Sequence, residues 1–473
     1  MTSGSDAERF DLVVIGSGPA GEKGAALAAY HGKRVALVER SPSLGGTTVA
    51  TGGIPTKALR ETALRVRAGR ADDALTVTLD LPAAFRRLRA HATAASAAMG
   101  SAVSENLDRL GVEVVPGRAR LEAGGRVVRV SGEGRADRAL EGEAVLLATG
   151  SRPLRPPGIP FDGASVVDAG EILALDRPFG CVVIAGAGAV GSEFASIFAA
   201  VGVEVHLVEA GERFLPLLDG EVAALLAEDL RAAGVDLALA TTVAEVEQRA
   251  GGLEVRLSDG RVVPCDRLLV AAGRVPNTEG LGLEEAGVAV DARGHVVVDD
   301  RYRTTVPHVL AAGDVVGPPA LASTSMEQAR VALAHAFGFP LRRAVDDLLP
   351  VGIYTIPEAA GVGMTEETAA AAGIDFEVGR AWFRRNTKAV VARDTDGLVK
   401  LVFERATGRL LGAHVLGAEA AELVHLPQAV IHHGGGIGEF VDTTFNVPTR
   451  SDAFKYAAYD GIKRAEVRSA FAP

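Results

Sequence analysis

The chain has 473 residues, of which 48% are hydrophobic and 23% charged, and its formal net charge is −11. This length and composition predict a soluble globular protein of about three domains. The acidic balance argues against a nucleic-acid surface or a basic membrane face, so we expect neither nucleic acid nor a membrane as a partner.

The first residues do not resemble a targeting signal. Asp6 and Glu8 precede a short apolar run that ends at Gly16, which is the wrong order for a secretory signal. No stretch reaches the roughly 18 apolar residues that a membrane span needs. We therefore expect a cytoplasmic protein.

Residues 10–40 predict a strand, a turn, a helix and a second strand, the β-α-β unit that binds nucleotides. In the turn GSGPAG, Gly16 permits a tight bend, Gly18 lets the backbone approach a pyrophosphate, and Gly21 allows close helix packing. Glu39, 23 residues after Gly16, is placed to accept a hydrogen bond from a ribose hydroxyl. A purely structural glycine turn is the alternative. The residues predicted to bind nucleotide here are Gly16, Gly18, Pro19, Ala20, Gly21, Glu39 and Arg40.

The next stretch, Gly45–Lys57 (GGTTVATGGIPTK), predicts a turn leading into a helix begun by Pro55. A second helix is expected from about Leu81 to Leu110, with Gly100 as a weak point near its middle. Short strands follow and end in AVLLATGSRP, residues 144–153. The cofactor contacts predicted in this part of the chain are Gly46, Thr47, Lys57, Ala119, Thr149 and Gly150.

Residues 181–216 repeat the first pattern with GAGAVG, and Glu209 again lies 23 residues after the first glycine, Gly186. The chain therefore contains two copies of one dinucleotide-binding plan. FAD in one copy and a nicotinamide nucleotide in the other is the simplest account, although the motif alone does not assign them. Contacts predicted in and after this copy are Gly186, Gly188, Ala189, Val190, Gly191, Glu193, Glu209, Gly273 and Arg274.

Cys181 and Cys265 are the only cysteines, which is too few for a disulfide framework. Each is expected at the start of a strand, opposite the end where ligands bind in parallel sheets, and both are interpreted as structural. His432 and His433 precede a glycine run and are expected to be exposed or close to a helix cap. No spaced set of His, Cys and carboxylates predicts a metal site.

The residues from about Leu349 onward change in pattern. Strands are expected within residues 390–417, followed by two helical runs. After the second β-α-β copy, residues 311–314 read AAGD, and a helix is expected from about Ser323.

Residues 9–465 together resemble the flavoprotein disulfide reductases, which include lipoamide dehydrogenase and glutathione reductase. The similarity is closest to the soluble pyridine nucleotide transhydrogenases, on GIPTKALR, GSRP, GAGAVGSEFASIF, PVGIYTIPE, HHGGG and TTFNVPT. The resemblance implies an α/β fold with two Rossmann-like, three-layer dinucleotide-binding domains and a C-terminal α+β domain that forms a homodimer. The implied domains are an FAD-binding domain in two parts (1–151 and 278–345), an NAD(P)-binding domain (152–277) and an interface domain (346–473).

The same resemblance assigns residues around the flavin. It implies that Asp314 binds the ribityl chain and that the helix from about Ser323 points its positive end at the flavin. Gly313 and Ala322 are implied as further cofactor contacts. Lys57 matches the family lysine beside flavin N5, and Glu193 would pair with it, so these two are the predicted catalytic residues. The alternatives are a turn aspartate for Asp314 and surface positions for Lys57 and Glu193.

The family's sulfur chemistry is absent from this sequence. The family carries two cysteines with four residues between them, where this chain has Thr48 and Gly53. Its C-terminal histidine and orienting glutamate correspond to Val447 and Asp452. A dithiol relay needs two sulfurs, one of them a thiolate nucleophile, so we expect no disulfide reduction.

What remains is an FAD-dependent NAD(P)H oxidoreductase. NADH bound at Gly186 to Gly191 would pass hydride through flavin N5 to a small acceptor that is not a disulfide, as in a transhydrogenase. A quinone reductase or diaphorase is an alternative, and a catalytically decayed FAD-binding subunit is another. Glu209 favours NADH because a carboxylate repels a 2′-phosphate. NADP(H) stays possible, since Arg213 could bind that phosphate or could be a solvated side chain.

Overall fold

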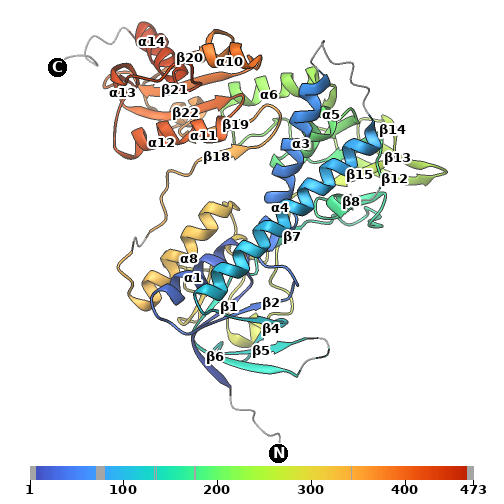
Figure 1. Ribbon diagram of the computed structural model, residues 1–473, viewed down its shortest axis with the longest axis vertical. Coiled ribbons are helices and arrows are strands. Elements are labelled where there is room, and N and C mark those ends of the chain that lie inside the picture. The colour runs from blue at the N-terminus through green and yellow to red at the C-terminus, as the bar shows by residue number, and fades with distance from the viewer. Residues whose placement is uncertain are drawn as a thin grey trace, which may run out of the picture. The chain divides into compact units, whose positions relative to one another are not determined.

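A computed structural model gives the fold of the chain (Figure 1) and describes residues 7–70, 80–132, 134, 136–174, 177–341 and 344–465. The chain divides into two compact units. The first unit comprises Met1–Leu59, Arg87–Leu154 and Gly273–Asp346, and the second comprises Arg60–Arg86, Arg155–Ala272 and Asp347–Pro473. The predicted domain limits at residues 151, 277 and 345 stay predictions.

The first unit is built on a sheet with the strand order β3-β2-β1-β6-β5-β4, and β17 pairs with β6. Strands β3, β2, β1, β6 and β17 are parallel, whereas β4 and β5 form an antiparallel extension. Its strands are β1 Glu8–Ile15, β2 Val35–Glu39, β3 Glu113–Pro116, β4 Arg118–Leu121, β5 Val127–Ser131, β6 Arg138–Leu147 and β17 Val309–Ala311, with a separate pair β7 Ser151–Pro153 and β16 Arg274–Pro276. Its helices are α1 Pro19–Tyr30, α2 Gly46–Ala50, α7 Leu283–Ala286 and α8 Ala322–Phe337.

The core of this unit follows from alternation along buried strands. Leu12 and Val14 of β1 face the alanine-rich helices α1 and α8, and Val13 and Ile15 face the opposite core. Successive side chains of a strand point to opposite faces, so a strand with both faces covered is apolar throughout. The predicted strand–helix–strand order of residues 10–40 is confirmed.

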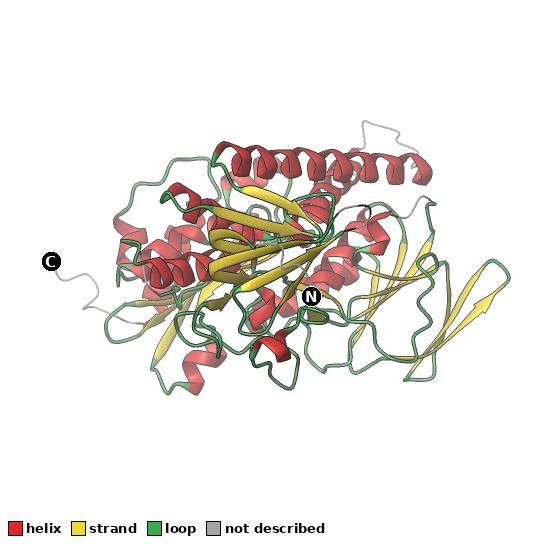
Figure 2. Ribbon diagram, turned by 90° about the horizontal axis from the view of Figure 1, so that it is seen from below, coloured by secondary structure: helices red, strands yellow, loops and turns green. Residues whose placement is uncertain are grey.

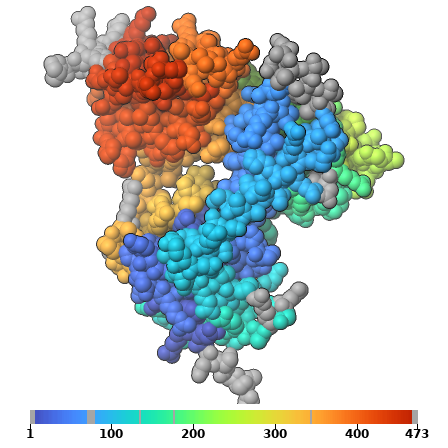
Figure 3. Space-filling model, viewed as in Figure 1, coloured from blue at the N-terminus to red at the C-terminus, as the bar shows by residue number. Residues whose placement is uncertain are grey.

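Helices α3 (Ile54–Arg70) and α4 (Leu81–Arg109) begin where the sequence places them. Pro55 lies in the first turn of α3, and α4 ends one residue before the predicted Leu110. The helix continues through Gly100, where an added methyl group would lie 3.3 Å from Ser43 Oγ. Glycine at this point allows the loop of residues 43–44 to approach α4. Many α4 side chains are exposed and form the light-blue band in Figure 3.

The second unit contains a fully parallel sheet with the order β11-β10-β9-β15-β8, and an antiparallel sheet β12-β13-β14 packs beside it in one core. Figure 2 distinguishes the helices and strands of the chain by colour. The parallel strands are β8 Val166–Asp168, β9 Cys181–Ala185, β10 Glu204–Val208, β11 Val235–Ala238 and β15 Arg267–Val270. The others are β12 Val243–Arg249, β13 Gly252–Leu257 and β14 Val262–Cys265, and the helices are α5 Ala189–Ala200 and α6 Gly220–Ala232.

The expected position of Cys265 at the start of a strand is wrong. Cys265 ends β14, and the next strand, β15, begins at Arg267. Asp266 separates the two strands: its backbone N–H donates to Cys181 O at 3.1 Å, and its carboxylate accepts from the N–H groups of Gly180 and Cys181. The chain therefore leaves one sheet and enters the other at Asp266. The expectation for Cys181, which begins β9, is confirmed.

The C-terminal part of the second unit forms an antiparallel sheet in the order β18-β19-β22-β21-β20 with helices packed on it. Its strands are β18 Val351–Ile353, β19 Ala359–Gly363, β20 Phe376–Trp382, β21 Leu398–Glu404 and β22 Leu410–Leu416. Its helices are α9 Glu366–Ala371, α10 Thr387–Ala392, α11 Ala420–Leu423, α12 His425–His432, α13 Gly438–Asp442 and α14 Ala453–Ala465. Among the helices described in both units, none is long and apolar enough to cross a bilayer.

The strands expected within residues 390–417 are β21 and β22, whereas residues 390–392 lie in α10. The Asn386 side chain accepts a hydrogen bond from Ala389 N at 2.9 Å and caps the start of this helix. Arg393, with φ of 53°, ends it in the left-handed region. The β-branched pair Val390 and Val391 is exposed rather than packed, so local capping decides the conformation against their strand propensity.

A buried ion network joins α6 to the C-terminal sheet. Lys400 of β21 is 1% exposed, and its Nζ lies 2.7 Å from Asp219 Oδ1, 3.0 Å from Glu221 Oε2 and 2.5 Å from Glu366 Oε1. Burial lowers the pKa of Lys400, but its hydrogen bonds to Asp219 and Glu366 raise that pKa above the ordinary value. The ammonium is therefore held charged in the interior.

Replacing Lys400 with methionine should lower the free energy of unfolding by about 3–5 kcal/mol, because the buried carboxylate of Asp219 would lose its cation. Chemical denaturation followed by circular dichroism measures this loss. The matched control is Arg249→Met, which removes an exposed ion pair and should change stability little. Equal effects of the two substitutions would contradict the assignment of Lys400 as the buried link.

Candidate functional site

The first glycine loop leaves open space at the start of α1. Gly16 has a φ of +102°, and a methyl group there would lie 2.4 Å from the carbonyl oxygen of Ala148. A methyl group at Gly21 would lie 1.8 Å from Gly16 O, whereas one at Gly18 would meet nothing within 4 Å. Two glycines thus permit the fold, and the third keeps the approach to the helix N-terminus clear for an anion.

The second glycine loop has the same construction. Gly186 has a φ of +106°, and a methyl group there would lie 2.5 Å from Ala271 O. A methyl group at Gly191 would lie 1.8 Å from Gly186 O, and one at Gly188 would again meet nothing within 4 Å. The repeated plan inferred from the sequence is present in the structure.

The acidic residue at the end of the second strand of each β-α-β unit accepts hydrogen bonds from its own glycine loop. Glu39 accepts from Ser17 N at 2.9 Å and from Ser17 Oγ at 2.7 Å, and its other oxygen accepts from Ser41 N at 2.8 Å. Glu209 accepts from Ala187 N at 2.8 Å and from Gly211 N at 2.9 Å. A carboxylate oxygen can accept more than one hydrogen bond, so both acids keep capacity for a ribose hydroxyl.

The turn at residues 45–53 lies directly against the first glycine loop. Gly45 N donates to Ser17 Oγ at 3.1 Å, and a methyl group at Gly46 would lie 2.7 Å from Gly18 Cα. Ser17 therefore links the glycine loop, Glu39 and this turn. The sequence analysis did not single out Ser17, although its hydroxyl within GSG was the available signal.

Thr48 and Gly53 are neighbours across this turn. A methyl group at Gly53 would lie 2.8 Å from Thr48 Cγ2 and 2.7 Å from Thr48 O. Lys57 begins the next turn of helix, where its N–H donates to Gly53 O at 3.3 Å and its Nζ lies 3.4 Å from Thr56 Oγ1. The two positions that hold sulfur in the resembled family are thus in contact here, with neither carrying sulfur.

The side chains of Asp314, Ser151 and Arg274 lie close together in the first unit. Ser151 Oγ lies 2.5 Å from Asp314 Oδ2, and Arg274 Nε donates to Ser151 Oγ at 2.7 Å and lies 3.7 Å from Asp314 Oδ2. Gln328 holds the preceding residue by accepting from Gly313 N at 2.8 Å. The sequence analysis assigned no role to Ser151, although this residue lies in the GSRP stretch, or to Gln328, which lies outside the quoted motifs.

The start of α8 carries an unsatisfied hydroxyl. Thr324 is 2% exposed, and its Oγ1 has no hydrogen-bond partner among the residues the structure describes. Leu321 precedes the helix without a side-chain cap, so its first N–H groups keep their positive end unneutralised by a side chain. Buried polar groups are normally paired, and a bound ligand would supply the missing partner.

The remaining predicted contacts lie close to these loops or on neighbouring strands. Thr149 Oγ1 donates to Asn277 O at 2.8 Å, and Asn277 Nδ2 donates to Thr149 O at 2.9 Å, which fixes the segment around Gly150. The other predicted contacts are Pro19 and Ala20 in the first turn of α1, exposed Arg40 after β2, Thr47 in α2, Ala119 on β4, Ala189 and Val190 in the first turn of α5, exposed Gly273 before β16, and exposed Ala322 at the start of α8.

Glu193 lies in α5 of the second unit and is 7% exposed. Its Oε1 accepts from Tyr354 N at 3.1 Å. Lys57 belongs to the first unit, and the predicted Lys57–Glu193 ion pair stays a prediction.

Val447 and Asp452 occupy the positions of the histidine and the glutamate of the resembled family, and neither carries an imidazole. Val447 is 62% exposed, and Asp452 is 6% exposed and accepts from Asn386 Nδ2. Burial raises the pKa of Asp452 above the ordinary carboxyl value. His432 ends α12 and His433 follows as its cap, and both are exposed, as expected.

Two family models cover most of the chain. Residues 10–336 match "pyridine nucleotide-disulphide oxidoreductase", and residues 349–458 match the dimerisation domain of the same name. The chain belongs to the pyridine nucleotide-disulphide oxidoreductase family. The dimerisation-domain match supports the predicted homodimer.

Similar proteins of this family include soluble pyridine nucleotide transhydrogenases. That of Mycobacterium tuberculosis is 38% identical over 471 residues, covering 98% of this chain and 99% of the relative. That of Hahella chejuensis is 38% identical over 463 residues, covering 96% and 99%. The predicted resemblance to this branch is confirmed.

Solved structures of similar fold include one from Escherichia coli and one from Mycobacterium tuberculosis. The HOCl-induced flavoprotein disulfide reductase RclA from Escherichia coli has a TM-score of 0.85 at 31% identity, covering 94% of this chain and 98% of its own. LpdA from Mycobacterium tuberculosis has a TM-score of 0.87 at 28% identity, covering 96% and 99%. The glutathione-reductase-like α/β fold and the cofactors FAD and NAD(P)H are therefore confirmed for this family member.

The substitution Gly188→Ala tests the second glycine loop. The backbone at Gly188 has a φ of −70°, which alanine adopts, so folding and FAD content should not change. The methyl group would occupy the space that a pyrophosphate needs, so the dissociation constant for NADH should rise roughly tenfold, a cost of ~1.4 kcal/mol. Stopped-flow reduction at several NADH concentrations measures the constant.

Gly191→Ala is the matched comparison. Its methyl group would clash with Gly186 O at 1.8 Å, so this variant should lose thermal stability as well as NADH binding. Unchanged NADH affinity in Gly188→Ala would contradict the assignment of this loop.

Proposed function

We propose that the protein is an FAD-dependent oxidoreductase that passes hydride from NADH to a small acceptor other than a disulfide, with a pyridine nucleotide as the first candidate acceptor. The observation that carries the proposal is the contact between Thr48 and Gly53. The turn retains its place against the glycine loop, yet neither residue provides a thiolate.

The two cysteines of the chain are poor substitutes for the missing pair. Burial raises the pKa of the Cys181 thiol to about 12, with the carboxylate of Glu204 adding to the effect, and burial raises that of Cys265 to about 11. Both are protonated thiols near neutral pH, and the thiolate is the reactive form. Cys181 also begins β9, whereas Gly186 follows the other end of that strand.

The residues of the first unit fit FAD, which when bound supplies a ring that accepts and donates hydride. The glycine loop and α1 would hold its pyrophosphate, and Glu39 would hold a ribose. Asp314, oriented by Ser151 and Arg274, would hold its ribityl hydroxyls. The uncapped start of α8 and the buried Thr324 hydroxyl would face its polar ring edge.

The absence of an imidazole at Val447 supports hydride transfer rather than disulfide reduction. Reducing a disulfide creates a thiolate that must be protonated, and a nearby general acid does this work. Transfer of hydride to an oxidised nicotinamide ring requires no proton. A site without a histidine is thus sufficient for exchange between two pyridine nucleotides.

Quinone reduction is a second candidate, favoured by Glu209. Its carboxylate is fixed by the N–H groups of Ala187 and Gly211 at the position that a 2′-phosphate would need. Such a charge favours NADH over NADPH and weakens a reaction that must use both. An enzyme with NADH as its only nucleotide would then pass electrons to another small acceptor.

Anaerobic reduction by NADH should bleach the bound FAD without producing the long-wavelength band of a thiolate beside the flavin. Rapid-scan absorbance measures this, and reoxidation with thio-NAD, NADP or menadione separates the acceptors. A band that disappears in Cys181→Ser would contradict the proposal. FAD that stays oxidised under excess NADH and NADPH would contradict any turnover and favour a decayed binding subunit.

The double variant Thr48→Cys/Gly53→Cys is the positive control. The two positions are in contact, so the introduced thiols should form a redox pair, and the band should appear when this variant is reduced. The variant Thr48→Ser, which keeps a hydroxyl, should behave as the wild type.

Glu209→Gln should increase the reduction rate with NADPH relative to NADH by roughly tenfold, because like-charge repulsion of the 2′-phosphate is removed. The ratio of the two stopped-flow rate constants measures this preference. The matched control is Glu212→Gln, an exposed acid three residues further along the chain that should leave the ratio unchanged. An unchanged ratio in Glu209→Gln would remove the argument for NADH.

A further inference from the structure

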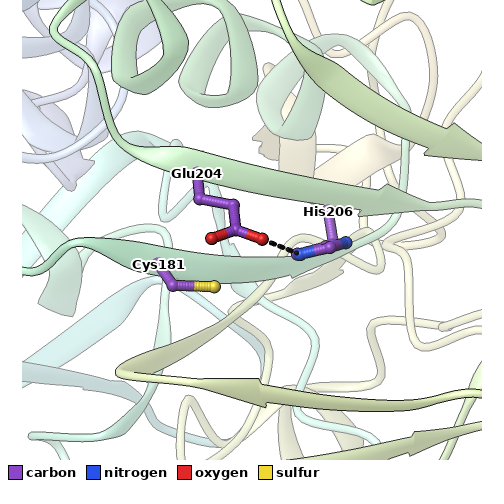
Figure 4. A group of neighbouring side chains, drawn as sticks. All are labelled: Cys181, Glu204 and His206. Carbon is purple, nitrogen blue, oxygen red and sulfur yellow. Dashed lines mark hydrogen bonds and ion pairs between the residues drawn. The ribbon is translucent and has the colours of Figure 1, made fainter.

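A cluster of three chemically different side chains lies on the parallel sheet of the second unit (Figure 4). Cys181, Glu204 and His206 each direct a ligand atom at the others, and the three atoms lie within 4.8 Å of one another. His206 Nε2 is 3.1 Å from Glu204 Oε1. A thiol, a carboxylate and an imidazole are each groups that can ligate a metal ion, so the cluster differs from a purely acidic one.

The strand register explains why these residues meet. Glu204 of β10 is the direct partner of Cys181 on the parallel strand β9. His206 lies two residues after Glu204, so all three side chains point to the same face of the sheet. The 22 residues between Cys181 and Glu204 hid this group from the sequence analysis, which expected no metal site.

A fourth residue orients the imidazole. Asp236 of β11 is the register partner of His206, and its Oδ2 lies 2.9 Å from His206 Nδ1. A carboxylate on one ring nitrogen leaves the other nitrogen directed at a metal and raises its basicity, which is the usual arrangement behind a metal-binding histidine. Asp236 is itself held by Arg261 Nη1 at 3.0 Å.

We propose that Cys181, Glu204 and His206 bind a divalent transition-metal ion, with Zn²⁺ as the expected ion. One sulfur, one nitrogen and one carboxylate oxygen suit zinc, whereas calcium and magnesium prefer oxygen alone. The three protein ligands leave a fourth tetrahedral position for water. The ion would enter past Glu204, whose side chain is 68% exposed, toward His206, whose side chain is 17% exposed.

The site is separate from the proposed hydride transfer. Cys181 and Glu204 begin their strands, and the glycine loop follows the opposite end of β9 at Gly186. The ion would link β9 to β10 and, through Asp236, to β11. It should therefore stabilise the sheet without changing the reduction of the enzyme by NADH.

Metal binding also has a proton signature. A divalent metal ion binds a cysteine as its thiolate, so the Cys181 thiol must lose its proton when the ion binds. Occupation of the site should release a proton to the solvent. It should also protect Cys181 from alkylating reagents.

Titration of the purified full-length holoenzyme with Co²⁺ is the test. We expect one equivalent to give the visible d–d absorption of tetrahedral cobalt and a near-ultraviolet thiolate-to-cobalt band, both lost when excess Zn²⁺ is added. The difference spectrum against the untitrated enzyme removes the flavin absorption. Absence of the thiolate-to-cobalt band at saturating Co²⁺ would overturn the proposal.

Variants assign the ligands. Cys181→Ser should lose the charge-transfer band, and His206→Asn should lose tight binding. Asp236→Asn should weaken the affinity by roughly 10- to 100-fold while keeping the band. Thermal unfolding without metal identifies any variant that fails to fold, and the wild-type titration decides the proposal without the variants.

The matched control is His433→Asn, an exposed histidine outside the cluster, which should bind cobalt as the wild type does. A band that persists in Cys181→Ser would place the ion elsewhere and overturn the proposal. A histidine that only pairs with its two flanking carboxylates would give no band in the wild type or in any variant, and that result would overturn the proposal as well. Failure of NADH to reduce the flavin would leave these spectra unaffected.

Discussion

The hydrogen bond between a carboxylate and the amide that follows the first glycine of each loop organises both nucleotide-binding units. Glu39 bonds to Ser17 N, and Glu209 bonds to Ala187 N in the same way. Each hydrogen bond joins the end of the second strand to the turn after the first strand. It therefore fixes the positions of the helix N-terminus, the glycine backbone and the acid relative to one another. The first copy has an additional contact, because the hydroxyl of Ser17 also accepts from Gly45 N.

This additional hydrogen bond holds the turn of residues 45–53 against the first glycine loop. The turn that carries Thr48 and Gly53 is anchored through Ser17, and Ala187, at the corresponding place in the second copy, has no hydroxyl with which to hold an equivalent turn. The turn persists without the sulfur pair that it carries in the resembled disulfide reductases. Its contacts with Ser17 and Gly18 hold it against the first glycine loop.

The second unit is stabilised by charge at two places with different consequences. Around Lys400, the buried carboxylate of Asp219 and the partly exposed carboxylates of Glu221 and Glu366 surround the buried ammonium and neutralise its charge. Around His206, a thiol and three charged side chains lie at the start of the strands, and carboxylates outnumber the nearby cation Arg261. The first arrangement joins two parts of the fold, whereas the second leaves coordination capacity for an ion.

The sequence alone determined what depends on neighbours along the chain. The glycine turns, the 23-residue spacing to Glu39 and Glu209 and the continuous α4 could all be predicted, because backbone angles and helical or strand periodicity are local. Tertiary structure decided that Cys265 ends a strand, since Asp266 bonds to a distant strand, and that Cys181 meets His206, since register pairs β9 with β10. Hydrogen bonds between strands many residues apart leave no periodic trace in the sequence, and for that reason the Ser151–Asp314–Arg274 cluster also became visible only in the folded chain.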